Sequence, residues 1–498
     1  MLALAGALLA RPPGGGAAET WTPPLGIPAP SFGIAELAGP RTHYVDNTHP
    51  RATDAGNPEG SPERPRMTVP PSLPEGSVVE VRGGPYGGAP RAVWTARGTA
   101  ARPVFVRGIA RPEVRGLELR VAGSYAVVEG FVFAGAPVRL RGDHLSFRGN
   151  EVRGFSPPRH NAALSGVGSD LVIHGNEIHG NGEAAGAREV DIHGIKFATG
   201  TERLWIVDNQ IHHNGGDAVQ IGGATTEPWA HHVYIGRNDL HEDRENAVDI
   251  KQARDVVISQ NRAWGYRAVS SSDGTAIVVH DNPDRVWVLF NEIHSSVNGV
   301  RNNGSTASYI VGNVIRNIHH DPAERDYDPD SAWGTGAGVI SWRTGDLYVV
   351  NNTFFDVDAG IHYPDRSGRL HLANNIVGRL SQRAHHVAIP RPPVAEASTL
   401  SHSLLQAPTR LNWGGERHDL RSFRRAFRAQ CQGCLDRDPL FLGAEDLRLR
   451  ADSPAVDAGM AHPLYDLFQR VYGLSIARDH AGRPRPQGAG WDLGAFER

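Results

Sequence analysis

Short runs of alternating apolar and polar residues recur along the chain, and each run ends in asparagine. The first run covers residues 145–150 (LSFRGN), and eight further copies follow at a mean spacing of 28 residues. Alternation with a period of two, together with many Val and Ile residues, is typical of β-strands rather than helices. The asparagines that end the runs are Asn150, Asn176, Asn209, Asn238, Asn261, Asn291, Asn313, Asn352 and Asn375. The pattern predicts a repeat array of short strands.

A second motif, a small residue followed by a β-branched one, accompanies most copies, so each repeat holds two or three strands separated by tight turns. Leucine-rich repeats need Leu at several fixed positions, and propeller blades run to about 40 residues or more. The spacing here varies from 22 to 39 residues, which fits coils whose turns accept insertions. Asn tolerates left-handed turns, and its amide can hydrogen-bond to an Asn stacked above it. We therefore expect an all-β, right-handed parallel β-helix with its asparagines stacked at one turn.

The flanking segments differ from the repeats. Residues 1–18 are apolar and then small, which predicts a signal peptide and a secreted, periplasmic or cell-surface protein. Residues 19–75 are rich in Pro and Gly and predict an N-terminal cap or extended segment, residues 76–395 the β-helix, and residues 396–498 a C-terminal capping segment. Residues 420–429 predict one amphipathic helix. Cys431 and Cys434, the only cysteines, favour a local disulfide in an exported chain.

Charge and hydropathy exclude two classes of partner. The net charge of −3 gives no basic field for nucleic acid, and no later apolar run approaches the ~20 residues of a membrane span. We expect a monomer.

Among 51 basic residues only Lys196 and Lys251 are lysine, and both follow a small/β-branched pair. Lysine can lose its proton when burial or nearby cations lower its pKa, whereas arginine cannot act as a base. The two lysines therefore indicate a site that needs a base, although two incidental surface lysines are the simpler interpretation.

Aligning the second strands of the repeats predicts which side chains share an outer face. If Ile195, Val219, Val248, Ile277 and Val300 point inward, the next residues point outward. Lys251 and His280 then become vertical neighbours, with Asp249 beside Lys251. The predicted strip contains Lys196, Gln220, Asp249, Lys251, His280, Arg301, Asn303, Trp342 and His362.

Several segments resemble the chondroitinase-B and alginate-lyase group of polysaccharide lyases. They are residues 245–252 (ENAVDIKQ), 256–261 (VVISQN) and 101–108 (ARPVFVRG), while the tail segments 438–441, 452–459 and 492–497 are similar to the C-termini of secreted β-helix proteins. The resemblance implies β-elimination on a uronic acid, with Lys251 as the base. The group places an arginine where this chain has His280, and Arg301 is then expected to bind the substrate carboxylate. The resemblance also implies Ca²⁺, for which Asp217, Glu245 and Asp249 are the candidate ligands.

The expected function is therefore a lyase acting on an anionic polysaccharide. Its catalytic residues are Lys251, His280 and Arg301, and its substrate-binding residues are Lys196, Gln220, Asn303, Trp342 and His362. A C5-epimerase shares the first proton transfer, and a glycoside hydrolase would use Asp217 and Asp249. A non-catalytic glycan-binding protein would instead rely on Trp264, Trp333 and Trp342 as stacking platforms.

Overall fold

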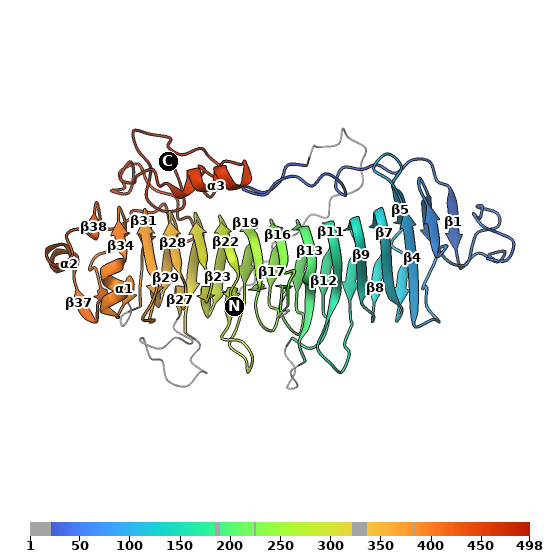
Figure 1. Cartoon of the computed structure of the whole chain (residues 1–498), viewed down its shortest axis with the longest axis horizontal. Coiled ribbons are helices and arrows are strands. Elements are labelled where there is room, and N and C mark those ends of the chain that lie inside the picture. The colour runs from blue at the N-terminus through green and yellow to red at the C-terminus, as the bar shows by residue number, and fades with distance from the viewer. Residues whose placement is uncertain (1–20, 185–189, 224–225, 321–335, 382–384) are drawn as a thin grey trace.

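The chain folds as a right-handed parallel β-helix, seen side-on in Figure 1. The computed structural model describes residues 21–184, 190–223, 226–320, 336–381 and 385–498. Strands make up 46% of the chain and helices 5%, so the predicted fold class is confirmed. The predicted signal peptide, residues 1–18, lies outside the described residues. None of the described helices has the length and hydropathy needed to cross a bilayer.

Each coil contributes strands to three outer faces, and among the described residues all but one of the strand pairings are parallel. The first, here called the open face, carries the predicted strip. Its strands are β2 (Ser72–Pro74), β4 (Arg91–Arg97), β15 (Val219–Ile221), β18 (Val248–Lys251), β21 (Thr275–His280), β24 (Asn298–Asn303), β27 (Ala337–Trp342), β30 (Ala359–His362), β33 (Val387–Ile389) and β36 (Leu411–Trp413). β37 (Glu416–His418) adds the one antiparallel pairing, to β36.

The second face, here called the covered face, follows the open face in each coil. Its strands are β1 (His43–Asp46), β3 (Val78–Arg82), β5 (Val104–Gly108), β16 (Ala230–Gly236), β19 (Ala253–Ser259), β22 (Asp284–Leu289), β25 (Ala307–Val311), β28 (Asp346–Val350), β31 (Arg369–Ala373), β34 (Thr399–Ser401) and β38 (Cys431–Gln432). Four long strands bend across both faces: β7 (Glu118–Glu129), β9 (Val138–Arg148), β11 (Asn161–His174) and β13 (Ile192–Val207). The bend in β7, β9 and β11 falls at Gly123, Gly142 and Gly168, where a Cβ atom would lie within 2 Å of the neighbouring coil's carbonyl oxygen.

The third face is a separate sheet of 13 short strands. They are β6 (Glu113–Arg115), β8 (Val132–Ala134), β10 (Glu151–Arg153), β12 (Glu177–His179), β14 (Gln210–His212), β17 (Asp239–His241), β20 (Arg262–Trp264), β23 (Glu292–Ser296), β26 (Val314–Ile318), β29 (Thr353–Val357), β32 (Ile376–Val377), β35 (Leu404–Leu405) and β39 (Leu435–Asp436). The stack of strands from β1 to β39 thus extends beyond residues 76–395 at both ends.

The predicted asparagine stack lies at the turn between the covered and third faces. Asn238 shows the pattern: its Oδ1 accepts from the backbone N–H and from Nδ2 of Asn209, at 2.9 and 3.0 Å. Its own N–H and Nδ2 donate to Asn261 in the next coil. The same bonds join all nine asparagines from Asn150 to Asn375, each of them buried. The stack satisfies polar groups that the turn buries and fixes the register between coils.

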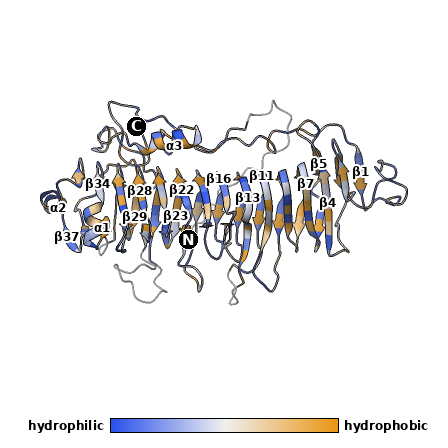
Figure 2. Cartoon of the chain, viewed as in Figure 1, coloured by the Kyte–Doolittle hydropathy of each residue, from blue (hydrophilic) through white to orange (hydrophobic). Residues whose placement is uncertain are grey.

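Apolar residues from all three faces fill the inside of the coils. The inward column Ile195, Val219, Val248, Ile277 and Val300 is fully buried, as predicted. Figure 2 shows apolar and polar residues alternating along the strands. Successive coils bury the same positions, so the core is one continuous column along the helix.

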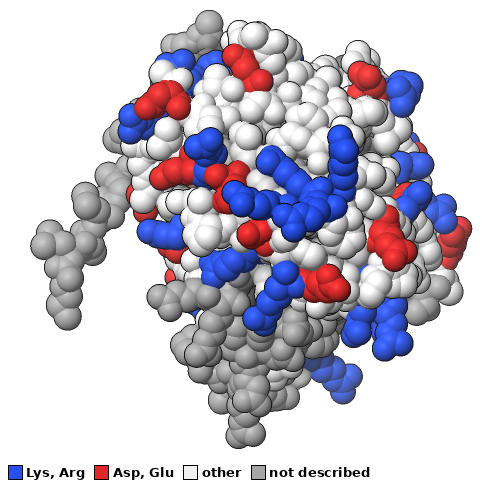
Figure 3. Space-filling model, turned by 90° about the vertical axis from the view of Figure 1, so that its left-hand side faces the viewer, with Lys and Arg blue, Asp and Glu red and all other residues white. Residues whose placement is uncertain are grey.

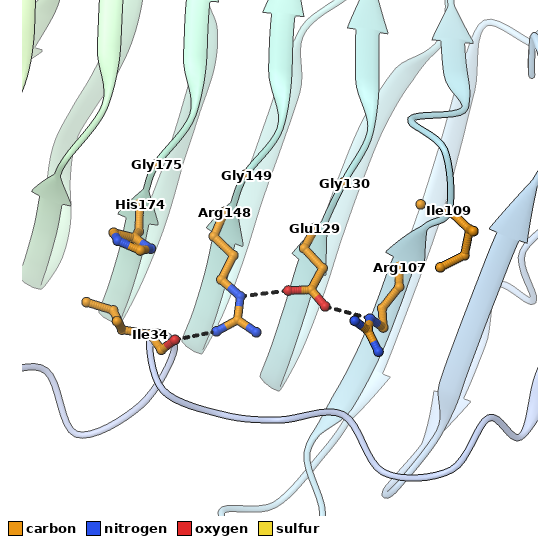
Figure 4. A pocket seen from close by; sticks show the side chains of 10 residues that line it. Ile34, Arg107, Ile109, Glu129, Gly130, Arg148, Gly149, His174 and Gly175 are labelled. Carbon is orange, nitrogen blue, oxygen red and sulfur yellow. Dashed lines mark hydrogen bonds and ion pairs between the residues drawn. The ribbon is translucent and has the colours of Figure 1, made fainter. Parts of the chain in front are cut away.

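The N-terminal segment, residues 21–36, runs along the covered face (Figure 1). Leu25 N–H donates to Gln260 Oε1 at 2.8 Å, and Trp205 Nε1 donates to the Pro28 carbonyl at 2.8 Å. Further along, Arg148 binds the Ile34 carbonyl and Glu129 (Figure 4). The hollow of about 510 Å³ in that view contains Arg107, which also pairs with Glu129. This hollow is therefore an anchor point of the segment.

The C-terminal residues also pack on the covered face, and not only at the end of the helix. The helix α3 (Leu464–Tyr472) buries Phe468 against Trp287, with ring centroids 4.8 Å apart. Two earlier helices are α1 (Pro392–Ala397) and α2 (Leu420–Ala426). The predicted helix is confirmed as α2, which inserts Leu420 and Phe423 into the core at the C-terminal end. Figure 3 looks onto this end, where basic side chains gather, and Arg421, Arg424, Arg425 and Arg428 are all exposed.

The expected disulfide is absent from the structure. Cys431 and Cys434 are both free thiols and both buried. Cys434 Sγ instead donates to the Leu400 carbonyl at 3.4 Å. The pair belongs to the packed end of the core, where β38 completes the covered face.

Candidate active site on the open face

The strand register places the candidate residues as the sequence predicts. Lys196 pairs with Gln220, Gln220 with Asp249, and Lys251 with His280 in adjacent coils. The same ladder continues through Arg301 and Asn303 to Ile340 and Trp342. The residues therefore form one strip along the helix axis.

Asp249 is the centre of this strip. Its Oδ2 lies 2.9 Å from Lys251 Nζ, and its Oδ1 lies 2.9 Å from His280 Nε2. The carboxyl group is 3% exposed because these two side chains cover it, while each of them remains about one fifth exposed. The two ion pairs hold the pKa of Asp249 below its ordinary value although burial acts to raise it. Asp249 is thus an ionised, buried group that orients a lysine and a histidine at the surface.

The two lysines have opposite pKa shifts. At Lys251 burial acts to lower the pKa, but the charge and hydrogen bond of Asp249 raise it above the ordinary value. At Lys196 burial lowers the pKa, and the positive charge of Lys251 adds to that effect. Lys196 Nζ also lies 2.9 Å from His160 Nε2. Lys196 therefore loses its proton more readily in the free protein than Lys251.

A buried cluster of possible metal ligands lies beside the strip. His193, Asp217 and Glu245 each offer an atom within 4.8 Å of the others. Burial, with added repulsion from neighbouring carboxylates, raises the pKa of Asp217 and of Glu245 to about 8. Burial lowers the pKa of His193 to about 3, so this imidazole is neutral. Ionising both buried carboxyl groups therefore costs free energy, and a bound cation would offset that cost.

His193 is not among the site residues predicted from the sequence. It occupies the position just before the small residue of the second motif, as Asp217 and Asn246 do in the next coils. A polar column at this position, His193, Asp217, Asn246, Thr275 and Asn298, is the signal that would have revealed it. Asp249, expected among the metal ligands, instead faces Lys251 and His280, and Gln220 Nε2 links it to Asp217 at 3.4 and 3.3 Å.

The C-terminal part of the strip differs from the expectation. Arg301 Nη1 is paired with the buried Asp273, 2.7 Å away, so a carboxylate already neutralises its charge. His362, expected to bind substrate, is 1% exposed. Its neighbour on the strip, Ile340, packs with Ala337, Ala359 and Trp342 in a small apolar cluster, which closes this end of the strip.

The three tryptophans considered as stacking platforms do not form one surface. Trp264 lies on the third face, stacked between His241 and His294 at 4.3 and 5.7 Å. Trp342 lies on the open face beside Asn303. Trp333 lies outside the described residues.

Comparisons with known proteins support the fold. Residues 193–377 match the family described as a right-handed beta helix region. A mutant of the PL6 family alginate lyase AlyGC aligns with 78% of this chain and 58% of its own, at 14% identity and a TM-score of 0.51. Pectate lyase Pel9A aligns with 93% of this chain and 98% of its own length, at 15% identity and a TM-score of 0.44. The GH136 lacto-N-biosidase from Eubacterium ramulus aligns with 74% of this chain and 64% of its own length, at 10% identity and a TM-score of 0.42. No curated protein matches the chain.

Fold and comparisons together define this chain as a right-handed parallel β-helix protein. At these identities the likeness to solved structures concerns the fold alone. The chemistry of the strip has to be argued from its own residues.

Proposed function

We propose that the protein is a lyase that cleaves a uronic-acid polysaccharide by β-elimination on the open face. The observation that carries the proposal is Asp249, which holds Lys251 and His280 side by side at 2.9 Å each on a partly exposed strip. An extended strip on a solenoid suits a linear polymer, and basic groups suit its carboxylates. The alginate lyase that shares the fold makes uronic-acid polymers the first substrates to test. Export to the cell surface or medium, where such polymers occur, is part of the same proposal.

The reaction requires one proton to leave C5 and one to reach the leaving oxygen. The base takes the C5 proton, the C–H electron pair forms the C4–C5 double bond, and the bond from C4 to the glycosidic oxygen breaks. That oxygen then accepts a proton. We assign the base to Lys251 and the proton donor to His280, because Asp249 fixes both at neighbouring positions. Lys196 would hold a carboxylate of the bound chain, whereas Arg301 is already paired with Asp273.

The protonation state of Lys251 is the demanding part of this assignment. Its pKa is raised by Asp249, so the free protein holds it as an ammonium ion. Additional positive charge near Asp249 would offset this effect. Lys196, whose pKa is lowered, is the alternative base on the same strip.

The buried cluster fits a divalent cation. Asp217 and Glu245 offer carboxylate oxygens, His193 offers a ring nitrogen, and within the described residues Gln220 Oε1 is buried without a hydrogen-bond partner. Ca²⁺ prefers oxygen ligands, whereas a nitrogen ligand favours Mn²⁺ or Zn²⁺. Bound there, the cation would supply positive charge beside Asp249 and Lys251. We propose that Asp217, Glu245 and His193 hold it, with Ca²⁺ the first ion to test.

The test is an assay of polygalacturonate, alginate and chondroitin for the ultraviolet absorbance of the unsaturated product, with and without a chelator. Accumulation of this product, lost in Lys251→Met, supports the proposal. Cleavage that gives only saturated reducing ends would contradict it and would indicate a hydrolase. Inversion at C5 without cleavage would indicate an epimerase.

One observation favours a glycoside hydrolase as a second candidate. Asp217 has a raised pKa and Asp249 a lowered one, and two carboxyl groups with separated pKa values are the usual acid and base of glycosidases. Asp217 is fully buried, however, so substrate does not reach it in this structure. The same assay separates the two, because hydrolysis leaves no double bond.

A further inference from the structure

The open face continues for several coils on the N-terminal side of the proposed active site. Lys196 pairs with Ser165, Ser165 with Arg139, Arg139 with Arg120, and Arg120 with Val93. These residues lie on the same outward column as Gln220 and Asp249. All of them except Lys196 line a hollow of about 420 Å³, whose walls also include Arg141 and, among the described residues, no acidic side chain.

Arg139 is the most buried of these three arginines. Its guanidinium donates to Ser165 Oγ and Asn161 Oδ1, both neutral acceptors, and to the Ala162 carbonyl at 3.4 Å. Burial, together with Arg120, lowers its pKa despite an opposing contribution from Glu118. Across the described residues no carboxylate forms an ion pair with Arg139 or Arg141. A half-buried cation of this kind costs free energy unless an anion completes its surroundings.

The carboxylate of Glu118, which lies near Arg139, already forms ion pairs with other arginines. Glu118 pairs with Arg120 at 2.6 Å and approaches Arg91 at 3.7 Å. The hollow therefore carries excess positive charge. The hollow of Figure 4 differs, because there Glu129 lies between Arg107 and Arg148 and forms an ion pair with each of them.

Apolar side chains complete the hollow. Val93 is 43% exposed, and Val167 lies beside Arg141 on the adjacent strand. A sugar ring presents apolar C–H groups next to its polar substituents, so a surface with both cations and exposed valine matches a charged sugar better than a small inorganic ion.

We propose that Arg120, Arg139, Arg141 and Ser165 form a distal subsite for a uronic-acid unit of the polysaccharide, on the same strip as the active site. Arg139 lies four coils from Asp249, or about 19 Å at ~4.8 Å per coil. The chain would therefore run parallel to the helix axis, and a substrate long enough to reach the subsite would bind more tightly than a short one. The inference rests on the proposed function only for the identity of the polymer, since the hollow itself is independent of Lys251.

The test measures binding separately from cleavage. Affinity electrophoresis in gels containing polygalacturonate or alginate reports the Kd of the full-length protein, and dextran sulfate provides a polyanion without uronic acid. Arg141 is exposed and, within the described part of the chain, its side chain forms no hydrogen bond or ion pair, so Arg141→Gln tests the subsite without endangering the fold. Arg139→Gln/Arg141→Gln tests the whole hollow, and Arg115→Gln, an exposed arginine on the third face, is the matched control.

We expect the double variant to bind a uronate polymer about tenfold more weakly and the control to bind like wild type. Where the protein cleaves, the loss in kcat/KM should be at least tenfold larger on the polymer than on the shortest substrate. Equal retardation of the double variant and wild type would overturn the subsite. So would retardation of wild type by dextran sulfate alone, or by none of the polymers. Weakened binding in the variant with no cleavage by wild type would support the subsite while removing the lyase activity.

Discussion

The covered face and the open face are built by neighbouring strands of the same coils, yet their outward side chains are different in kind. On the covered face one column reads Trp205, Tyr234, Val257, Trp287 and Tyr309. On the open face the equivalent column reads Lys196, Gln220, Asp249, Val278 and Arg301, which is polar or charged at every position except Val278. The backbone geometry is the same, so side-chain chemistry alone decides what each face binds.

The two faces solve opposite problems. The apolar column would leave a large hydrophobic surface in water, and residues 21–36 and α3 bury it. Among the described residues no comparable segment covers Lys251 and His280 on the open face, and both side chains stay partly exposed. A β-helix can therefore assign one face to its own termini and keep the adjacent one for a ligand.

The largest expected effect is a loss of catalytic activity after a substitution on the open face. Lys251→Arg keeps the charge and the ion pair with Asp249 but removes the proposed base. We expect kcat to fall by roughly three orders of magnitude or more, with Tm close to wild type. Lys196→Arg is the matched control, with a much smaller expected loss. Full activity in Lys251→Arg together with loss in Lys196→Arg would move the base to Lys196.

A substitution on the covered face should lower the stability of the protein and leave kcat unchanged. Phe468→Ala removes a fully buried ring from its contact with Trp287. We expect a loss of about 3 kcal/mol in the free energy of unfolding, with kcat of the folded protein retained. Denaturant unfolding and activity below the transition measure the two effects. Loss of kcat in the folded variant would show that the two faces are coupled.

The smallest expected effect is a pH dependence of stability that arises from the buried cluster of His193, Asp217 and Glu245. The pKa values of Asp217 and Glu245 are raised to about 8, so the folded state binds more protons than the unfolded state between their ordinary values and about pH 8. Stability should therefore fall as pH rises through this window. Below about pH 6.5 the lowered pKa of His193 acts in the opposite direction, so the effect is clearest from about pH 6.5 to 8.5.

Thermal unfolding across that range, with chelator or with added Ca²⁺, Mn²⁺ or Zn²⁺, checks the prediction. A bound cation should raise Tm most at the upper end of the range, because its ligands must be deprotonated. Asp217→Asn should weaken the pH dependence and abolish the response to the cation; the buried Asp243, whose pKa is also raised to about 8, keeps part of the pH dependence. An unchanged pH dependence in this variant would contradict the assignment of the raised pKa.

The sequence allowed the repeat, its register and the asparagine stack to be predicted, because each depends on residues that recur in every coil. Asp249, Lys251 and His280 were placed together for the same reason. Features that occur only once along the chain could not be predicted from the repeat. The ion pair of Arg301 with Asp273 involves a loop residue, and the burial of His362 follows from a local apolar cluster. The docking of residues 21–36 and of α3 on one face depends on contacts between distant segments.

The N-terminal segment also constrains the order of folding. Leu25 binds Gln260, 235 residues later, so the first described residues dock on coils that are made much later. A chain emerging from its N-terminus can add coils one by one onto those already stacked. Residues 21–36 can cover the first part of the aromatic column as soon as the middle coils form, but the contact of Phe468 with Trp287 requires α3, near the C-terminus. Between these two stages the growing chain exposes apolar surface around Trp287, so this is the interval in which aggregation is most favoured and a chaperone would act.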